Sequence, residues 1–181
     1  GELREPVAAL WRATAFVMTG VNEDNRERAD RFSELLQGKF PGIPVYYVGY
    51  KVNTLVSMQG SGSIVPMNQE VIAGQRGFGF CGIAHPASFR TTASEYGLKL
   101  AGFHAFADHQ RYSESTLSRL FREAQSTDAE YLLTTEKDLV KLSPFAEGMP
   151  LPLYGLRMQV ESESRLADFI LQSIRSQAQS G

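Results

Sequence analysis

Short apolar runs that alternate with amphipathic stretches are the feature that most constrains the fold of this chain. Residues 14–19 form an apolar run that ends at Gly20, and another apolar run covers residues 45–50. Between them, residues 22–37 carry charged side chains on one side of a helical pattern and apolar side chains on the other. Continuous apolar runs of this length are typical of buried parallel strands. The order strand, helix, strand therefore predicts an α/β fold, beginning with half of a doubly wound sheet.

The helix expected over residues 22–37 has a definite apolar face and a definite end. The face consists of side chains that recur at helical spacing, Ala29, Phe32, Leu35 and Leu36. Gly38 follows directly, and glycine is common just past the end of a helix. The spacing is that of an amphipathic helix that ends at Gly38.

The same alternation continues through the rest of the chain. Strands are expected at residues 77–83, 98–105, 131–134 and 151–160. Helices are expected at residues 86–96, 113–125, 135–142 and 162–176, the second of them capped by Ser113. Residues 51–74 differ, because a turn-rich sequence separates the apolar pairs 55–56 and 64–65. This pattern predicts a two-stranded hairpin that links two domains.

The composition of the 181-residue chain is that of a globular protein and excludes several classes of function. The chain has 43% hydrophobic residues, and its longest apolar runs are about six residues, far from the roughly 20 that span a bilayer. Its formal net charge is -2, so we expect no nucleic-acid partner. The single cysteine, Cys81, lies in an apolar, strand-like segment. It cannot form an internal disulfide, which indicates a buried thiol in a reducing compartment.

The first residues predict neither a signal peptide nor a natural start. Polar residues and a proline stand where an apolar segment would lie in a signal peptide, at Glu2, Arg4, Glu5 and Pro6. The sequence also opens with glycine rather than methionine. We interpret the chain as part of a longer protein.

The densest polar cluster lies between a predicted strand and a predicted helix, at residues 106–112. It includes Asp108, His109 and Arg111. In open α/β sheets, ligands bind where the carboxyl ends of strands and the amino ends of helices converge. An aspartate beside a histidine can orient a proton-transfer group, and Arg111 can meet an anion. Asp108 and His109 are therefore candidate catalytic residues, and the alternative is that they only satisfy turn hydrogen bonds.

A second polar group opens the helix expected after residue 134. Lys137 and the free amides of a helix start suit a phosphate or an acidic group. Thr135 and Asp138, three residues apart, equally suit a capping box that needs no ligand. Glu136 and Lys137 are thus candidates either for substrate binding or for a structural role.

Two further places carry polar residues that suit either a site or a structural role. His85 precedes Pro86 in another strand-to-helix turn, where it can act as a ligand or base, or as a local hydrogen-bonding residue. Arg4 and Glu5 can place a guanidinium on a phosphate or form a surface ion pair. The local sequence leaves both alternatives open.

The chain lacks the sequence motifs of the common catalytic sites. It contains no Gly-x-x-x-x-Gly-Lys-Ser/Thr sequence, so no phosphate-binding loop for ATP is visible. It also contains no Gly-x-Ser-x-Gly and no His-Glu-x-x-His sequence. One cysteine excludes a multi-cysteine zinc site, and we expect no metal site.

Five segments, taken in order and with their spacing, carry a family resemblance over nearly the whole chain. They are residues 1–6, 17–20, 82–86 with Phe89, 106–112 and 133–142. Together they resemble the tetraacyldisaccharide 4'-kinase family. The resemblance implies transfer of the ATP γ-phosphate, with Mg²⁺, to the 4'-hydroxyl of tetraacyldisaccharide 1-phosphate in lipid A biosynthesis. It also implies a location at the cytoplasmic face of a Gram-negative inner membrane, with peripheral membrane contact through an upstream part.

The resemblance further implies two α/β/α domains joined by a two-stranded linker. Residues 1–50 are then the remnant of a P-loop kinase domain whose upstream part holds the nucleotide. Residues 51–74 are the linker, residues 75–160 form the C-terminal α/β/α sandwich domain, and residues 161–181 form a terminal helix that packs back on the kinase domain.

The family motif also assigns roles to residues of this chain. His109 inherits support of an acidic residue of the P-loop domain that activates the sugar hydroxyl, and Asp108 orients His109 or the metal–nucleotide complex. Arg4 and Glu5 lie near the nucleotide side of the cleft. Ala107 and Gln110 depart from the motif, which has proline and a second histidine there. Glutamine keeps a hydrogen bond but cannot take a proton.

The expectation from these roles is that the chain alone has no kinase activity, because phosphoryl transfer depends on the P-loop and Mg²⁺. Two alternatives remain open. The chain is a noncatalytic module that binds an acyl-sugar or a partner, or it is a small metal-dependent hydrolase that uses Asp108, His109 and Asp138.

Overall fold

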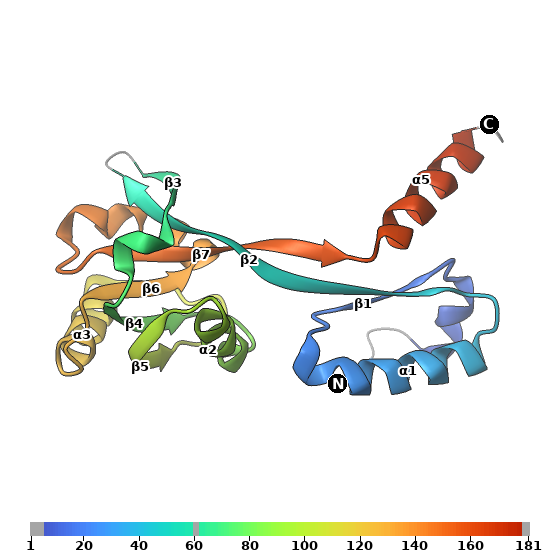
Figure 1. The fold of residues 1–181 in the computed structure, drawn as a ribbon, viewed down its shortest axis with the longest axis horizontal. Coiled ribbons are helices and arrows are strands. Elements are labelled where there is room, and N and C mark those ends of the chain that lie inside the picture. Colours follow the sequence, from blue (N-terminus) through green and yellow to red (C-terminus); the bar gives the residue numbers. More distant parts are fainter. Residues whose placement is uncertain (1–5, 60–61, 179–181) are drawn as a thin grey trace. The chain divides into compact units, whose positions relative to one another are not determined.

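The expected alternation of strands and helices is present in the computed structural model, which describes residues 6–59 and 62–178. The strands are β1 (Phe16–Thr19), β2 (Val45–Gln59), β3 (Ser63–Met67), β4 (Arg76–Cys81), β5 (Lys99–Ala105), β6 (Tyr131–Thr135) and β7 (Leu153–Ser162). The α-helices are α1 (Arg26–Lys39), α2 (Pro86–Glu95), α3 (Glu114–Gln125), α4 (Glu136–Lys141) and α5 (Ser164–Ala178) (Figure 1). The predicted α/β class is confirmed.

Contacts divide the chain into two units, residues 1–51 with 160–181 and residues 52–159. The strand order is β1-β2-β7-β6-β4-β5, with β3 paired to β2. The chain passes from one unit to the other within β2 and again within β7. The domain boundaries expected from the sequence, with residues 51–74 as a linker, stay a prediction.

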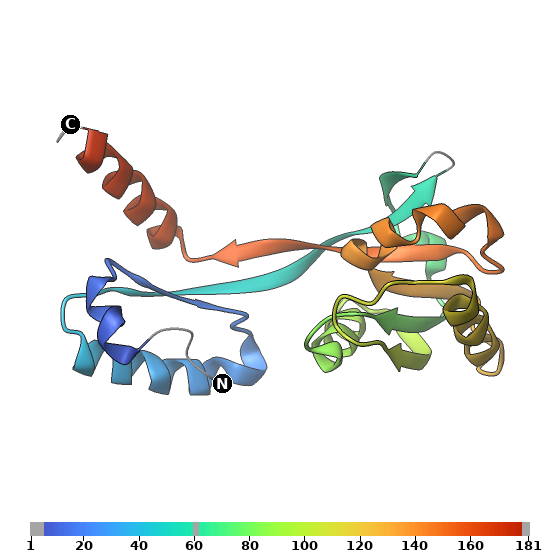
Figure 2. The same cartoon turned by 180° about the vertical axis from the view of Figure 1, so that it is seen from behind.

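The first unit is built on the parallel pair of β1 and β2, in which Phe16 lies opposite Val45. Side chains alternate between the two faces of a strand. Tyr46 and Val48 accordingly share one face of β2 and pack against Leu166 and Phe169 of α5. Helices α1 and α5 lie on opposite sides of the two strands (Figures 1 and 2).

Helix α1 differs from its prediction in its end. It continues through Gly38 to Lys39, and the amide of Phe40 donates to the Leu36 carbonyl at 2.8 Å. The left-handed turn that often follows a helix instead falls at Gly42, whose φ is +87°. The expected end at Gly38 is therefore wrong by one to two residues, which is the usual uncertainty of a helix boundary.

The predicted apolar face of α1 is only partly buried. Ala29 and Leu36 are buried, whereas Phe32 is 52% exposed and Leu35 is 69% exposed. The apolar stripe is wider than the strip of helix surface that the two strands can cover. The apolar side of this amphipathic helix is therefore not covered throughout in this chain.

The second unit centres on β4, which pairs in parallel with β5 on one side and β6 on the other. Phe78 and Phe80 of β4 pack with Leu117 and Leu120 of α3 on one face. A second cluster includes Cys81 of β4 and the α2 residues Phe89 and Ala93, together with Tyr131 and Leu133 of β6. Helices thus cover two faces of this parallel sheet, as the apolar strand sequences indicate.

The predicted hairpin is confirmed between β2 and β3, which pair antiparallel with Val56 opposite Pro66 and Met58 opposite Ile64. Its first strand is continuous with the strand expected at residues 45–50, so both belong to β2. Ser113 caps α3 as expected, because its side chain accepts a hydrogen bond from the Thr116 amide. Among the described residues, no helix combines the length and apolar content needed to cross a membrane.

Candidate functional site

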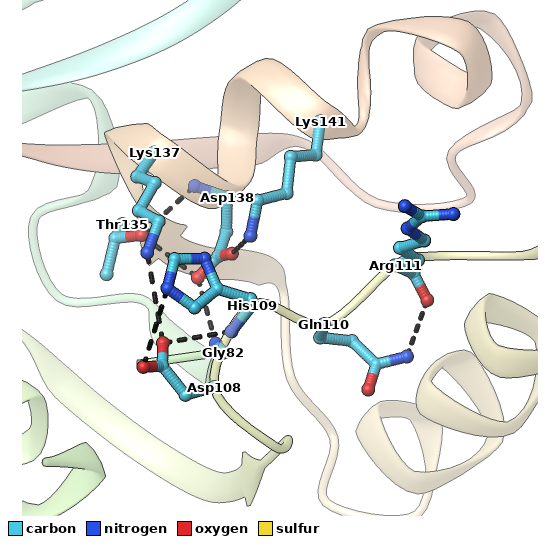
Figure 3. A network of polar contacts seen from close by, with 9 residues as sticks. All are labelled: Gly82, Asp108, His109, Gln110, Arg111, Thr135, Lys137, Asp138 and Lys141. Carbon is cyan, nitrogen blue, oxygen red and sulfur yellow. Dashed lines mark hydrogen bonds and ion pairs between the residues drawn. The ribbon is translucent and has the colours of Figure 1, made fainter. Parts of the chain in front are cut away.

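Polar side chains gather at one edge of the sheet in the second unit, where the parallel strands β4, β5 and β6 end. The strands end at Cys81, Ala105 and Thr135, and their following loops therefore converge. The loop after β5 carries Asp108 and His109, and the helix after β6 carries Lys137 (Figure 3). The structure thus brings together three of the site residues expected from the sequence.

Asp108 lies between two cationic or titratable partners. Its Oδ1 is 3.8 Å from Lys137 Nζ, and its Oδ2 is 3.7 Å from His109 Nε2. The side chains of Asp108, His109 and Lys137 are 42%, 77% and 48% exposed. Such solvated pairs contribute at most about 1 kcal/mol each to stability. The cluster therefore adds little to folding, and its groups are open to a ligand.

The backbone of His109 is held in an uncommon conformation. Its φ is +59°, in the left-handed region that few non-glycine residues adopt. The His109 amide donates to Asp108 Oδ1 at 2.9 Å and to the Gly82 carbonyl at 3.3 Å. The Gln110 amide donates to the Ala107 carbonyl at 3.1 Å, which closes a turn over residues 107–110. These bonds fix the direction in which the His109 ring leaves the loop.

A buried carboxylate lies beneath this turn. Asp138 of α4 has no exposed surface. It accepts hydrogen bonds from Lys141 Nζ at 2.7 Å, from the Gly82 amide at 2.9 Å and from Thr135 Oγ1 at 3.0 Å (Figure 3). Thr135 in turn caps α4 by accepting from the Asp138 amide at 3.1 Å. The threonine half of the expected capping box is confirmed. The Asp138 carboxylate, however, bonds to the Thr135 hydroxyl and to the Gly82 amide, and the local sequence does not predict the Gly82 contact.

The remaining predicted site residues have other surroundings. Glu136 forms a two-pronged ion pair with Arg157 of β7 at 2.6–3.0 Å. His85 is exposed at the start of α2, where its carbonyl accepts from the Ser88 hydroxyl at 2.7 Å. Arg111 is exposed, and its carbonyl accepts from the Gln110 side-chain amide. Arg4 and Glu5 lie outside the described residues.

Two groups next to Asp138 have raised pKa values. Burial, and then the negative charge of Asp138, raises the pKa of the Cys81 thiol to about 11. The same two causes, in the same order, raise the pKa of Tyr112 well above its ordinary value. Cys81 is fully buried, as the sequence predicts.

The chemical consequence is an unreactive Cys81. A thiol with a pKa near 11 is only about 0.1% thiolate at pH 8, and the thiolate is the reactive form. We expect the native chain to react with an aromatic disulfide reagent at pH 8 at least about 100-fold more slowly than the chain unfolded in guanidinium. Absorbance of the released thiol measures both rates, and equal rates would contradict the burial of Cys81.

The first unit contains a groove that the sequence analysis missed. Its volume is about 500 Å³. Its lining includes Met18 of β1, Val21 just after β1, and Arg28, Phe32 and Leu35 of α1. The two exposed apolar side chains of α1 therefore lie in a concave surface beside the edge strand β1. The wide apolar stripe of α1 is the sequence signal for this groove, but the same stripe is also typical of a helix face packed in a core.

The fold and the cluster at the strand ends define an α/β protein with a candidate site at the carboxyl edge of a parallel sheet. A sequence model of the family described as tetraacyldisaccharide-1-P 4'-kinase matches residues 1–175. The chain belongs to this family.

Individual relatives agree with this assignment. The tetraacyldisaccharide 4'-kinase of Desulfotalea psychrophila is 33% identical over 176 residues, which cover 97% of this chain and 48% of the relative. That of Syntrophus aciditrophicus is 30% identical over 182 residues, with the same two shares of 97% and 48%. A crystal structure of "apo" form LpxK from Aquifex aeolicus in complex with ATP is similar with a TM-score of 0.60 and 25% identity, covering 95% of this chain and 46% of that one. The chain thus spans about half the length of the relatives it matches.

Proposed function

We propose that this chain is the acceptor-side part of a kinase that transfers the ATP γ-phosphate to the 4'-hydroxyl of tetraacyldisaccharide 1-phosphate. Family membership supports the reaction class. The observation that carries the proposal is the convergence of Asp108, His109 and Lys137 at the carboxyl ends of β5 and β6, where Asp108 lies 3.7 Å from His109 and 3.8 Å from Lys137. The kinase acts in lipid A biosynthesis at the cytoplasmic face of the bacterial inner membrane, which the upstream part contacts peripherally.

Each residue of the cluster has a distinct role in this proposal. His109, 77% exposed, supports the acidic group that takes the proton of the sugar hydroxyl. Asp108 favours one orientation of the His109 ring. Its negative charge also offsets the positive charge of Lys137 at this edge of the sheet. Lys137 supplies a positive charge that a substrate phosphate can meet. Glu136 holds Arg157 and has a structural role, and His85 remains a candidate for substrate contact.

The residues described do not fit the nucleotide–magnesium complex. The sequence has no P-loop, and the described residues contain no group of three or more His, Cys, Asp or Glu side chains that could hold a metal ion. We propose that ATP and Mg²⁺ bind mainly in the part of the family's length that this chain does not span, with Arg4 and Glu5 on the nucleotide side of the cleft. The first unit is then part of the nucleotide-binding domain, and the second is the C-terminal α/β/α domain.

The proposal is tested by comparing the 181-residue chain with a full-length parent. The parent should phosphorylate tetraacyldisaccharide 1-phosphate at the 4' position with radiolabelled ATP and Mg²⁺, since positioning and charge stabilisation by the P-loop and metal supply most of the catalysis. The chain alone should give no product above a reaction without enzyme. Turnover by the chain, with contaminating kinase removed, would refute the proposal that ATP and Mg²⁺ bind mainly outside this chain. A parent that is inactive on this lipid would refute the proposed reaction.

A further inference from the structure

Asp138, in the first turn of α4, is buried more completely than its bond to the Thr135 cap requires. It is the one acidic or basic side chain among the buried residues of the described part of the chain. Burying a carboxylate is costly unless hydrogen bonds and an opposite charge compensate. Lys141 and Thr135 belong to the same helix or its cap, but the third donor, the Gly82 amide, lies 56 positions away in the sequence. The carboxylate therefore joins α4 to the end of β4.

Gly82 joins the same carboxylate to the turn that carries His109. Its amide donates to Asp138, and its carbonyl accepts from the His109 amide at 3.3 Å. A Cβ atom at position 82 would lie 2.9 Å from Gln110 Cβ and 3.1 Å from the Ala107 carbonyl oxygen. Such distances are below ordinary contact, so the turn packs directly on the Gly82 backbone.

The turn needs such a support because the His109 backbone is in the left-handed region. A conformation of this kind is strained and persists only where the surroundings determine it. Two contacts come from α4: Asp138 through Gly82, and Lys137 through Asp108. Without the contact from Asp138 through Gly82, α4 would reach the turn only through the exposed pair of Lys137 and Asp108.

We propose that Asp138 is a positioning residue, whose buried carboxylate fixes Gly82 and through it the backbone and ring direction of His109. The inference rests on the proposed function and deepens it, because it names a residue that acts on the site without touching substrate. Figure 3 shows the path from Lys141 and Asp138 through Gly82 to the turn. A role limited to holding the Thr135 cap of α4 would predict loss of stability without any change at His109.

The first measurement needs no kinase activity. The chain contains three histidines, His85, His104 and His109, so their ring signals can be assigned by NMR of histidine-labelled protein. Asp138→Asn removes the negative charge that holds Lys141 and replaces one acceptor oxygen by an NH2 donor. We expect the His109 ring and amide signals to shift or broaden, and its amide hydrogen exchange to accelerate at least about tenfold, while His85 and His104 stay unchanged.

Two variants separate position from stability. Leu133→Ala, in the fully buried middle of β6, should destabilise the second unit without moving the His109 signals. Gly82→Ala pushes the turn from the other side and should move the same His109 signals as Asp138→Asn. Gly82→Ala therefore shows how the His109 signals respond when the turn itself is displaced. If Asp138→Asn does not fold, Asp138→Ser is measured in its place. Unchanged His109 signals in the folded Asp138 variant would overturn the proposal.

The second measurement uses the full-length parent. Asp138→Asn should lower kcat about 10- to 100-fold, as expected from a misplaced catalytic group, and leave KM for ATP within about twofold. A drop in kcat without a change at His109 would overturn the positioning role. If His109 moves but substitution of His109 itself leaves turnover unchanged, the positioning contact stands and the proposed function of His109 fails.

Discussion

Substitution of His109 in the full-length parent should lower kcat for 4'-phosphorylation by about 100-fold or more, with little change in KM for ATP. A positioned proton-transfer group contributes roughly 10²- to 10⁴-fold, and His109 supports the base rather than being the base, which favours the lower end. The ring is 77% exposed and contributes little to the fold. The loss should therefore appear in turnover and not in stability.

The choice of substituent matters because the φ of His109 is +59°. Alanine adopts the left-handed region poorly, whereas asparagine tolerates it, so His109→Asn removes the imidazole with less disturbance of the turn. Equal losses in His109→Ala and His109→Asn would assign the effect to the ring. His104→Gln is a matched control, since His104 pairs with Glu123 of α3 at 2.6 Å and not with the cluster. Turnover within twofold of the wild type in His109→Asn would show that the assigned role is wrong.

The local sequence predicts much of the fold because many elements are determined by their nearest neighbours. Ser113 and Thr135 mark helix starts through hydroxyl caps, and Pro86 occupies the first turn of α2, as the structure shows. The apolar strands β4 and β6 are recognisable because both faces are buried. Once strand ends are known, the grouping of Asp108 with Lys137 follows from the parallel sheet.

What the sequence could not predict depends on contacts between distant segments or on how much surface is available for packing. The bond between Asp138 and the Gly82 amide joins positions 56 residues apart, and the local pattern around Asp138 is satisfied by a helix cap alone. The exposure of Phe32 and Leu35 depends on how much of the α1 surface is covered by neighbouring elements. Periodicity gives the direction of an apolar face, but it does not say whether anything covers it.

The exposed side of α1 gives a second prediction with a large effect. Substitutions there should change the stability of the full-length parent but not that of the 181-residue chain. If the first unit belongs to a larger nucleotide-binding domain, the groove beside β1 is covered there by further polypeptide of that domain. Burial of a Phe or Leu side chain contributes about 1.5–3 kcal/mol. The double substitution Phe32→Ser and Leu35→Ser should therefore lower the free energy of unfolding of this domain in the parent by about 3–6 kcal/mol.

In the 181-residue chain the same double substitution should change stability by no more than about 0.5 kcal/mol, because both side chains are already more than half exposed. The single tryptophan, Trp11, packs edge-on against Phe40 with ring centroids 4.8 Å apart, so its fluorescence reports unfolding of the first unit in denaturant. Leu36→Ala is the matched control, since Leu36 is 8% exposed and should destabilise both proteins by about 2–5 kcal/mol. In the parent, hydrogen exchange of the β1 and β2 amides gives the corresponding measurement. An equal response of both proteins to the double substitution would mean that the groove stays open in the parent, and the assignment of the first unit to a larger domain would lose its structural basis.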